Sequence, residues 1–319
     1  MLMKARISFL GWNFLKLNKY YIYATLLVTF ITFIKLFALF FYFKQSTFQT
    51  PDSSEYITVA DNLFDSYVTN SPEFLRLSLR RTPGYPFFIS LLPSAKSIIF
   101  SQIILHMIIT IIGIAIYRNI SKSKNTTIEL LVFIIIQIES SLLVYSFRIL
   151  SDLLFATLIA LLVYLIMIHG KNKKVRSMGL YLSGVIIFIV MVRPIGVGLV
   201  VVFLILNYLA NDKYLFRKLL IFTLVIITLY STYNYSKARM FVVSTIQNEY
   251  LLFYQGVGAK ALAESKSLSV IGLREESLRN KVIGEDANLK EVNSYNSQRG
   301  YELILQNKVS FLKLNAHGV

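Results

Sequence analysis

Long apolar runs alternate with short polar segments along most of the chain. A helix needs about 17–25 apolar residues to cross the roughly 30 Å of hydrocarbon in a bilayer. Runs near that length lie at 22–43, 98–117, 128–147, 152–168 and 219–235, and two shorter runs lie at 178–192 and 195–210. The pattern therefore predicts an all-α, polytopic membrane protein with about seven transmembrane helices.

The segment 178–210 fits either one long tilted helix or two short helices broken at Arg193-Pro194. Proline disrupts the interior of a helix, so the second interpretation places a break beside Arg193. A single helix would reverse the orientation of everything that follows it. Two short helices keep every basic loop on one side of the membrane, so we predict the break.

Basic residues gather at alternate ends of the runs, which orients the chain by the positive-inside rule. The segments taken as cytoplasmic carry Lys4, Arg6, Lys16, Lys19, Arg118, Lys122, Lys124, Lys171, Lys173, Lys174, Arg176, Lys213, Arg217 and Lys218. The amino terminus is then inside, and both the first outer loop 44–97 and the carboxyl terminus are outside. We expect a transmembrane domain at 1–235 and an extracytoplasmic helical segment at 236–319, in the cytoplasmic (plasma) membrane.

The composition agrees with lipid as the main solvent. The chain has 319 residues, of which 55% are hydrophobic and 16% charged, whereas a soluble domain carries about 25% charged residues. Cysteine is absent, which excludes disulfides, thiolate metal sites and cysteine nucleophiles. The three histidines, His106, His169 and His317, are too scattered for a metal site. The net charge of +16 serves orientation, so no nucleic-acid partner is expected.

The first outer loop is too long to be a simple connector, so we expect it to carry chemistry. Tyr56, Ile57, Ala60, Leu63 and Phe64 have helical spacing, which predicts a short amphipathic helix that starts at Asp52 and lies along the membrane surface. Asp52, Glu55 and Tyr56 share one face of it. Asp-x-x-Glu after a proline is also typical of a capping box, in which Asp52 would only satisfy backbone N–H groups.

The end of the same loop reads Arg80-Arg81-Thr82-Pro83-Gly84-Tyr85-Pro86. The arginines could bind an anion or simply reach lipid headgroups. The Pro-Gly-Tyr-Pro run could be only a stiff turn that enters the next span.

Together these pieces resemble the GT-C superfamily of glycosyltransferases that use polyprenyl-phosphate sugars, near the protein-mannosyltransferase or aminoarabinose-transferase type (families 39 and 83). Further similarities are Leu150-Ser151-Asp152-Leu153-Leu154-Phe155, Arg193-Pro194-Ile195-Gly196, Asn248-Glu249-Tyr250, Arg299-Gly300-Tyr301 and His317-Gly318-Val319. Members of the family usually continue with several more spans, so we expect a short or incomplete member.

The resemblance implies transfer of a sugar from a polyprenyl-phosphate donor to an acceptor hydroxyl at the outer face, with inversion. Asp52 would be the general base, aided by partial burial that raises its basicity. Arg80 and Arg81 would bind the donor phosphate, with Arg193 as a second candidate. The remaining substrate-binding candidates are Glu55, Tyr56, Tyr85 and Asp152.

Several of these residues have a plainer structural interpretation. Tyr56 and Tyr85 are also typical of interfacial aromatic belts. Asp152 could orient Arg148 or bind acceptor, but Ser151-Asp152 is also a good helix cap. Arg193 could cap the helix that it follows.

No cofactor is expected besides the lipid-linked sugar donor as co-substrate, and dependence on a divalent metal is left open. The acceptor could be lipid, glycan or protein, and membrane lipids surround the chain.

Ionisable residues inside predicted spans are rare and often functional. Lys35 could pair with Glu139 or face a lipid-phosphate cavity. His106 and Glu139 could each form interhelical hydrogen bonds or bind a ligand. In the segment 236–319, which we call the tail, we expect helices near 277–282 and 301–314. We also expect a bend at Gly256-Val257-Gly258 instead of a phosphate loop.

Other functions fit the same pattern. A lipid-linked-sugar transporter or flippase-like carrier would favour repeated halves, which the sequence lacks. A non-catalytic envelope-assembly subunit fits the short length. Among enzymes, an O-antigen polymerase or ligase is the nearest alternative.

Overall fold

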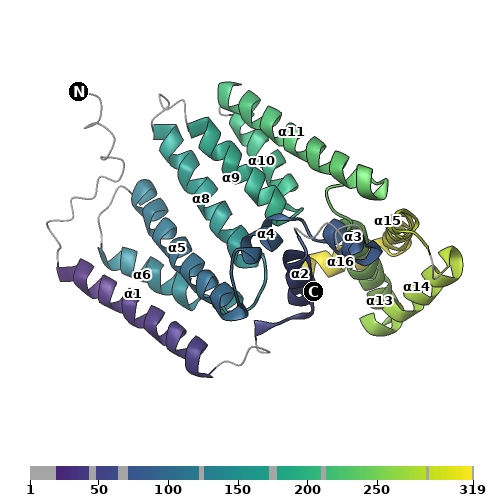
Figure 1. The fold of residues 1–319 in the computed structure, drawn as a ribbon, viewed down its shortest axis with the longest axis horizontal. Helices are drawn as coiled ribbons and strands as arrows, with labels where there is room; N and C mark the ends of the chain where they lie inside the picture. The colour runs from purple at the N-terminus through teal and green to yellow at the C-terminus, as the bar shows by residue number, and fades with distance from the viewer. Residues whose placement is uncertain are drawn as a thin grey trace. The chain divides into compact units, whose positions relative to one another are not determined.

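The computed structural model describes residues 19–42, 48–63, 71–121, 126–171, 178–209, 213–284 and 287–317. Every regular element in these ranges is a helix, which confirms the predicted all-α class (Figure 1). Many of the basic positions that orient the chain fall outside the described residues, in 1–18, 122–125 and 172–177. The predicted orientation therefore stays a prediction.

The chain divides into two compact units that do not follow chain order. Unit 1 consists of Met1–Gln49 and Ser94–Ile149, and unit 2 consists of Thr50–Pro93 and Leu150–Val319. Most of the predicted first outer loop thus belongs to unit 2, together with the tail. The boundary predicted after residue 235 lies inside unit 2.

Unit 1 is built from apolar helices that pack on α5. Its elements are α1 (Lys19–Phe37), the π-helical η2 (Ala38–Tyr42), α5 (Ala95–Ser121), α6 (Thr126–Ile138) and α7 (Ser140–Ser146). The run predicted as one span at 128–147 breaks at Glu139, where α6 and α7 meet at a bend of 58°. The Glu139 carboxylate accepts the backbone N–H groups of Ser141 and Leu142, at 3.1 and 2.6 Å, and so caps α7.

Lys35 lies inside unit 1, where its side chain is 5% exposed. Its Nζ donates to Gln137 Oε1 at 2.7 Å and lies 3.0 Å from His106 Nδ1. The pair with Glu139 considered above is wrong, because Glu139 is engaged as a helix cap. His106 instead forms the interhelical contact, as one of its two predicted roles required.

Apolar helices form a layer in unit 2, where α9 contacts each of the other three (Figure 1). These helices are α8 (Asp152–Lys171), α9 (Met178–Val192), α10 (Gly196–Leu209) and α11 (Lys213–Ala238). The predicted break at Arg193-Pro194 is confirmed, because α9 ends at Val192 and α10 begins at Gly196.

Two helices among the described residues are long and apolar enough to cross a membrane, Ala95–Ser121 and Leu219–Ala238, and the bent α6–α7 pair would be a third. Large apolar side chains on these helices are more than half exposed, such as Ile111 at 55% and Ile221 at 60%. Such exposure indicates a membrane protein. The apolar parts of α8, α9 and α10 are shorter, at Asp152–Ile168, Tyr181–Val192 and Gly196–Ile205.

Three short helices follow residue 49 in unit 2. They are α2 (Pro51–Asp61), α3 (Pro72–Arg80) and α4 (Gly84–Ser90). The helix predicted to start at Asp52 is α2, and it begins one residue earlier. Val59 of α2 is buried together with Phe74 and Leu77 of α3, so the two helices share a small apolar core.

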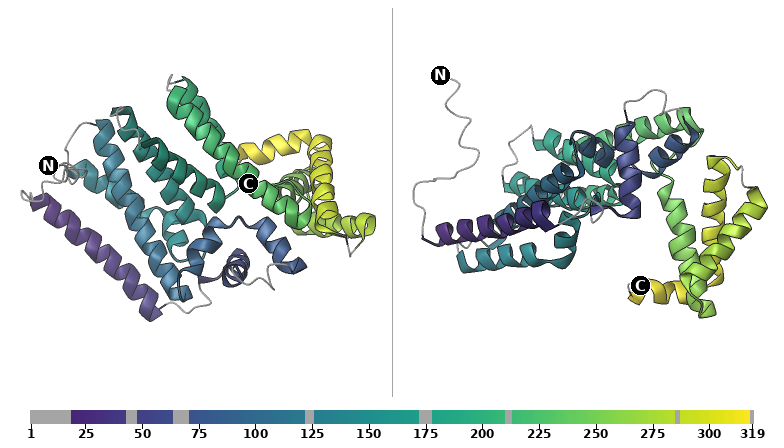
Figure 2. Two further views of the ribbon diagram at one scale, coloured as in Figure 1. Left: turned by 45° about the horizontal axis from the view of Figure 1, so that its top comes forward. Right: turned by 60° about the horizontal axis from the view of Figure 1, so that its bottom comes forward.

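The tail forms a helical cluster, seen in green to yellow in Figure 2. Its elements are α12 (Ile246–Tyr250), the π-helical η5 (Leu251–Gly256), α13 (Val257–Glu264), α14 (Leu268–Ile283), α15 (Leu289–Gln306) and α16 (Lys308–His317). The two predicted helices at 277–282 and 301–314 lie within α14 and within α15–α16. The bend predicted at Gly256-Val257-Gly258 is wrong, because η5 continues directly into α13.

Glycine at these positions instead allows two helices to approach closely. A Cβ atom on Gly256 would lie 3.1 Å from the carbonyl oxygen of Gly300, and one on Gly300 would lie 2.9 Å from the backbone carbon of Leu251. Contacts that short are tighter than packed side chains allow, so η5 and α15 meet backbone to backbone.

A small apolar core and one buried ion cluster hold the tail together. Leu252, Val257, Ala261, Ile271 and Leu303 are buried against one another. Glu275, with 0% exposure, accepts from Lys260 Nζ at 2.7 Å and from Arg299 Nε at 2.8 Å. Burial alone would raise the pKa of Glu275, but these two hydrogen-bonded cations lower it below its ordinary value.

We predict that Gly300→Ala lowers the free energy of unfolding by about 1–3 kcal/mol, because the new methyl group must displace the η5 backbone. Gly272→Ala is the matched control, because a Cβ atom added at Gly272 of α14 would meet no other atom within 4 Å. There the better helix former should stabilise by up to about 1 kcal/mol. Chemical unfolding of the purified full chain in detergent measures both changes, and equal effects would contradict the close packing.

Candidate functional site

Helix α2 begins with a cap that does not involve Asp52. Thr50 is the N-cap, its Oγ1 accepts the Ser53 backbone N–H at 3.3 Å, and Ser53 Oγ accepts the Thr50 N–H at 2.8 Å. Pro51 follows at the first helical position, where its missing N–H costs nothing. The capping-box interpretation of Asp52 and Glu55 is therefore wrong. Both carboxylates are free to bind other groups.

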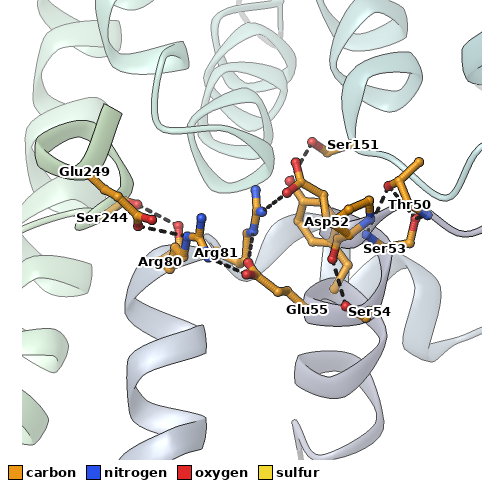
Figure 3. Close-up of polar contacts among 12 residues, drawn as sticks. Thr50, Asp52, Ser53, Ser54, Glu55, Arg80, Arg81, Ser151, Ser244 and Glu249 are labelled. Atoms are coloured by element: carbon orange, nitrogen blue, oxygen red, sulfur yellow. Dashed lines mark hydrogen bonds and ion pairs between the residues drawn. The ribbon is translucent and has the colours of Figure 1, made fainter. Parts of the chain in front are cut away.

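Both carboxylates bind Arg81, which follows α3 (Figure 3). Arg81 Nη2 donates to Asp52 Oδ1 at 2.5 Å, and Arg81 Nε donates to Glu55 Oε2 at 2.6 Å. The Arg81 side chain is 6% exposed, that of Glu55 is 18% exposed and that of Asp52 is 51% exposed. The partial burial expected for Asp52 is therefore modest, and its carboxylate stays accessible from outside.

Arg80 joins the same group from the last turn of α3. Its Nη1 donates to Glu55 Oε1, and its Nε lies 3.0 Å from Glu249 Oε2 of α12. The contact with Glu249 lacks hydrogen-bond alignment, and among the described residues Arg80 Nε has no aligned acceptor. We call Asp52, Glu55, Arg80, Arg81 and Glu249 the arginine cluster.

Glu249 is the member of the arginine cluster that sequence reasoning missed. The segment before α12 is tied to α3 by two hydrogen bonds, from Ser244 Oγ to the Arg80 carbonyl at 2.8 Å and from the Thr245 N–H to the Leu79 carbonyl at 3.0 Å. This docking brings Glu249 to Arg80. The only sequence signal was the short Asn248-Glu249-Tyr250 similarity, which indicated no partner.

The arginine cluster carries one negative charge in excess, because three carboxylates meet two guanidinium groups. Burial alone would lower the pKa of Arg81. Attraction by the oxygens of Tyr56, Glu55 and Asp52 outweighs burial and holds that pKa above its ordinary value. Arg81 is therefore a permanent cation whose charge is already matched.

Two tyrosines support Arg81 from behind. The Arg81 guanidinium lies over the Tyr56 ring, 4.8 Å from its centroid, and the Tyr85 ring meets Tyr56 edge to face at 4.9 Å. The Tyr56 hydroxyl is hydrogen-bonded to Ser151 Oγ at 3.0 Å. Tyr56 is 5% and Tyr85 0% exposed, so these rings pack against protein and do not form an open sugar platform.

Gly84 explains the Pro-Gly-Tyr-Pro run. A Cβ atom at Gly84 would lie 2.6 Å from the carbonyl carbon and oxygen of Met191, in the last turn of α9. The start of α4 therefore packs directly on the backbone of α9, just before the break at Arg193. The run is a packing contact between α4 and α9, and it places Tyr85 in the core.

Asp152 and Arg193 form an ion pair in unit 2 that is separate from the arginine cluster. Arg193 Nη1 donates to Asp152 Oδ1 at 2.5 Å, and its guanidinium lies 5.8 Å from the centroid of the Phe155 ring. Asp152 is the first residue of α8. The partner of Asp152 within unit 2 is Arg193, and Arg148 donates to the Gln49 carbonyl within unit 1. The role of Asp152 in orienting Arg148 stays a prediction.

The predicted site residues thus form one connected set within unit 2. Contacts link the arginine cluster through Tyr56 to Tyr85 and Ser151, and Ser151 precedes Asp152, the partner of Arg193. In the part of the chain that the structure describes, no group of three or more His, Cys, Asp or Glu residues could hold a metal ion. The arrangement offers an accessible carboxylate beside two fixed guanidinium groups.

Comparison of the chain with protein-family models, with curated proteins and with solved structures finds no match.

We predict that Arg81→Gln lowers the free energy of unfolding by about 2–3 kcal/mol, because the largely buried Glu55 then keeps only Arg80 as a counter-charge. The cost is below that of a fully buried pair because the half-exposed Asp52 regains water. Arg76→Gln, an exposed position on α3, is the matched control and should change stability by less than about 0.5 kcal/mol. Chemical unfolding in detergent compares the two variants. An unchanged free energy of unfolding for Arg81→Gln would contradict the central role of Arg81.

Proposed function

We propose that the protein is a membrane glycosyltransferase of the GT-C type, which transfers a sugar from a polyprenyl-phosphate donor to an acceptor hydroxyl at the outer face of the plasma membrane. The observation that carries the proposal is Asp52, an accessible carboxylate held beside the paired guanidinium groups of Arg80 and Arg81. A reaction that removes a proton while releasing a phosphate needs both groups in one place.

Asp52 acts as the general base. Its Oδ1 is held by Arg81, whereas among the described residues Oδ2 has no hydrogen-bond partner and half of the side chain is exposed. The acceptor oxygen forms a bond to the anomeric carbon as the bond from that carbon to the phosphate oxygen breaks. The acceptor proton goes to Asp52, and attack from the face opposite the phosphate inverts the anomeric carbon.

The departing group requires a cation, because the donor phosphodiester gains a second negative charge as it becomes a phosphate monoester. Arg80 is the better candidate, since its side chain is 28% exposed, compared with 6% for the side chain of Arg81. Arg81 keeps Asp52 and Glu55 in position and thus acts as a positioning residue. The charge stabilised at Arg80 grows in the transition state, which favours the reaction itself over ground-state binding.

Glu249 must yield when the donor binds. The arginine cluster already carries excess negative charge, so a phosphate can reach Arg80 only if one carboxylate moves away. Glu249 has the weakest hold of the three, because its contact with Arg80 lacks hydrogen-bond alignment and its side chain is 35% exposed.

The remaining residues shape the site. Glu55 bridges the two arginines, and Tyr56 with Tyr85 backs Arg81 against the core. On the α8–α10 side of the set, Arg193 stays the second candidate for the donor phosphate, and its partner Asp152 is a candidate for acceptor contact. The full proposal includes seven spans, an internal amino terminus, an external carboxyl terminus, and α2 to α4 at the outer interface.

We predict that Asp52→Asn lowers the transfer rate by about 10²–10⁴-fold, because asparagine keeps the shape and cannot accept the proton. Asp61→Asn is the matched control, since Asp61 ends the same helix and is exposed. Transfer is measured in membranes supplied with a polyprenyl-phosphate sugar and candidate acceptors. A wild-type rate for Asp52→Asn would exclude Asp52 as the base.

We predict opposite effects of Arg80→Gln and Glu249→Gln on binding of a short-chain polyprenyl phosphate in detergent. Arg80→Gln should weaken binding about ten-fold through the lost charge-assisted hydrogen bond. Glu249→Gln should strengthen binding about three-fold by removing the competing charge. Glu276→Gln, an exposed carboxylate of α14 paired with Arg279, controls for net charge and should have no effect. Weaker binding by Glu249→Gln would contradict the exchange.

A further inference from the structure

The tail contains a polar groove. One of its lining residues, Asn248, directly precedes Glu249 of the arginine cluster in the sequence. The groove has a volume of about 420 Å³ and is lined by the segment 239–242, by Asn248 of α12 and by one face of α15. Sites for small ligands usually enclose about 300–1,000 Å³, so the groove is large enough for one.

The walls of the groove are fixed by contacts that do not need a ligand. Asn234 Nδ2 donates to the Val242 carbonyl at 2.7 Å, which ties the 239–242 segment to α11. Asn248 Nδ2 donates to Asn293 Oδ1 at 3.1 Å, which joins α12 to α15. Arg239 has a left-handed backbone, with φ of 55°, and its guanidinium lies 5.9 Å from the centroid of the Tyr235 ring. The groove is therefore preorganised.

The charge of the groove is positive and unmatched. Among the described residues, Arg239 and Lys290 line the groove, no carboxylate does, and neither cation has an ion-pair partner. This contrasts with the arginine cluster, where carboxylates outnumber the cations. An anionic ligand could bind these two cations without first displacing a carboxylate from them.

The rest of the lining favours a polyhydroxylated ligand over a bare anion. Two amide and two hydroxyl groups of α15 line the groove, at Asn293, Ser294, Ser297 and Gln298. With Lys290 they have the spacing of one helix face, which extends for about 12 Å at 1.5 Å per residue. Amides and hydroxyls both donate and accept, as sugar hydroxyls do. Phe241, 60% exposed, adds an apolar surface at the same groove.

We propose that this groove binds an acidic oligosaccharide, with Arg239 and Lys290 on its carboxylates and the α15 face on its hydroxyls. Segment 239–249 also docks on α3 and carries Glu249 to Arg80. The groove is then the acceptor subsite of the transferase, an assignment that rests on the proposed function. Binding of the saccharide itself requires neither donor nor catalysis.

Isothermal titration of the purified full chain in detergent tests the groove with three probes: tetragalacturonic acid, neutral maltotetraose and inorganic phosphate. Tetragalacturonic acid should bind, and Arg239→Asn and Lys290→Gln should each weaken it about ten-fold. Asparagine tolerates the left-handed backbone at 239, so the change removes charge without adding strain. Arg274→Asn and Lys281→Gln on α14 are the matched controls and should have no effect.

The outcomes separate this inference from the proposed function. The site is overturned if tetragalacturonic acid does not bind, or if both groove variants bind it with wild-type affinity, even if Asp52→Asn abolishes transfer. Equal affinity for maltotetraose overturns the role of the cations, and equal affinity for phosphate overturns recognition of a saccharide. Loss of affinity confined to the groove variants supports the site even if no transfer is ever observed.

Discussion

The candidate site depends on one buried cation, the guanidinium of Arg81. The Arg81 side chain is only 6% exposed, so its charge must be paired, since an unpaired buried charge is costly. Asp52 and Glu55 supply that pairing from consecutive turns of α2, and the Tyr56 ring covers the open face. Pairing at two points fixes both the position and the rotation of α2 relative to the end of α3. The accessible carboxylate of Asp52 is a consequence of that constraint.

The same constraint explains why carboxylates outnumber guanidinium groups in the arginine cluster. Satisfying Arg81 takes two carboxylates, and Glu55 extends the pairing to Arg80, so Glu249 brings the negative charge into excess. A site built in this way is stable without ligand, but it requires an exchange of charges before a phosphate can enter. Glu249 is suited to that exchange because it lies on a different segment from the residues that hold Arg81. The cost of opening then falls on the α12 segment and leaves the α2–α3 pairing intact.

Sequence reasoning predicted the helices, and which residues gather at the candidate site, better than it predicted the local contacts of those residues. The break at Arg193-Pro194 and the clustering of acidic and basic residues in the first loop follow from proline geometry and from composition, and both are found. Thr50 replaces Asp52 as the cap because Pro51 takes the first helical position, and a threonine directly before a proline is a sequence signal for that cap. Glu249 and the Lys35–Gln137 contact depend on distant segments meeting, and the Gly256–Gly300 contact depends on shape. No local pattern encodes any of the three.

Segment 239–249 carries contacts of both candidate sites, which bears on how the proposed transferase could order its substrates. Its first residues line the groove, its middle binds the end of α3, and Glu249 contacts Arg80. A saccharide in the groove that shifts this segment would change the charge at Arg80, and hence the affinity for the donor phosphate. Coupling of two binding equilibria is reciprocal, so the donor must alter saccharide affinity by the same factor. Because one short segment carries both contacts, binding of the two proposed substrates could be coupled without any rearrangement of the helix layer.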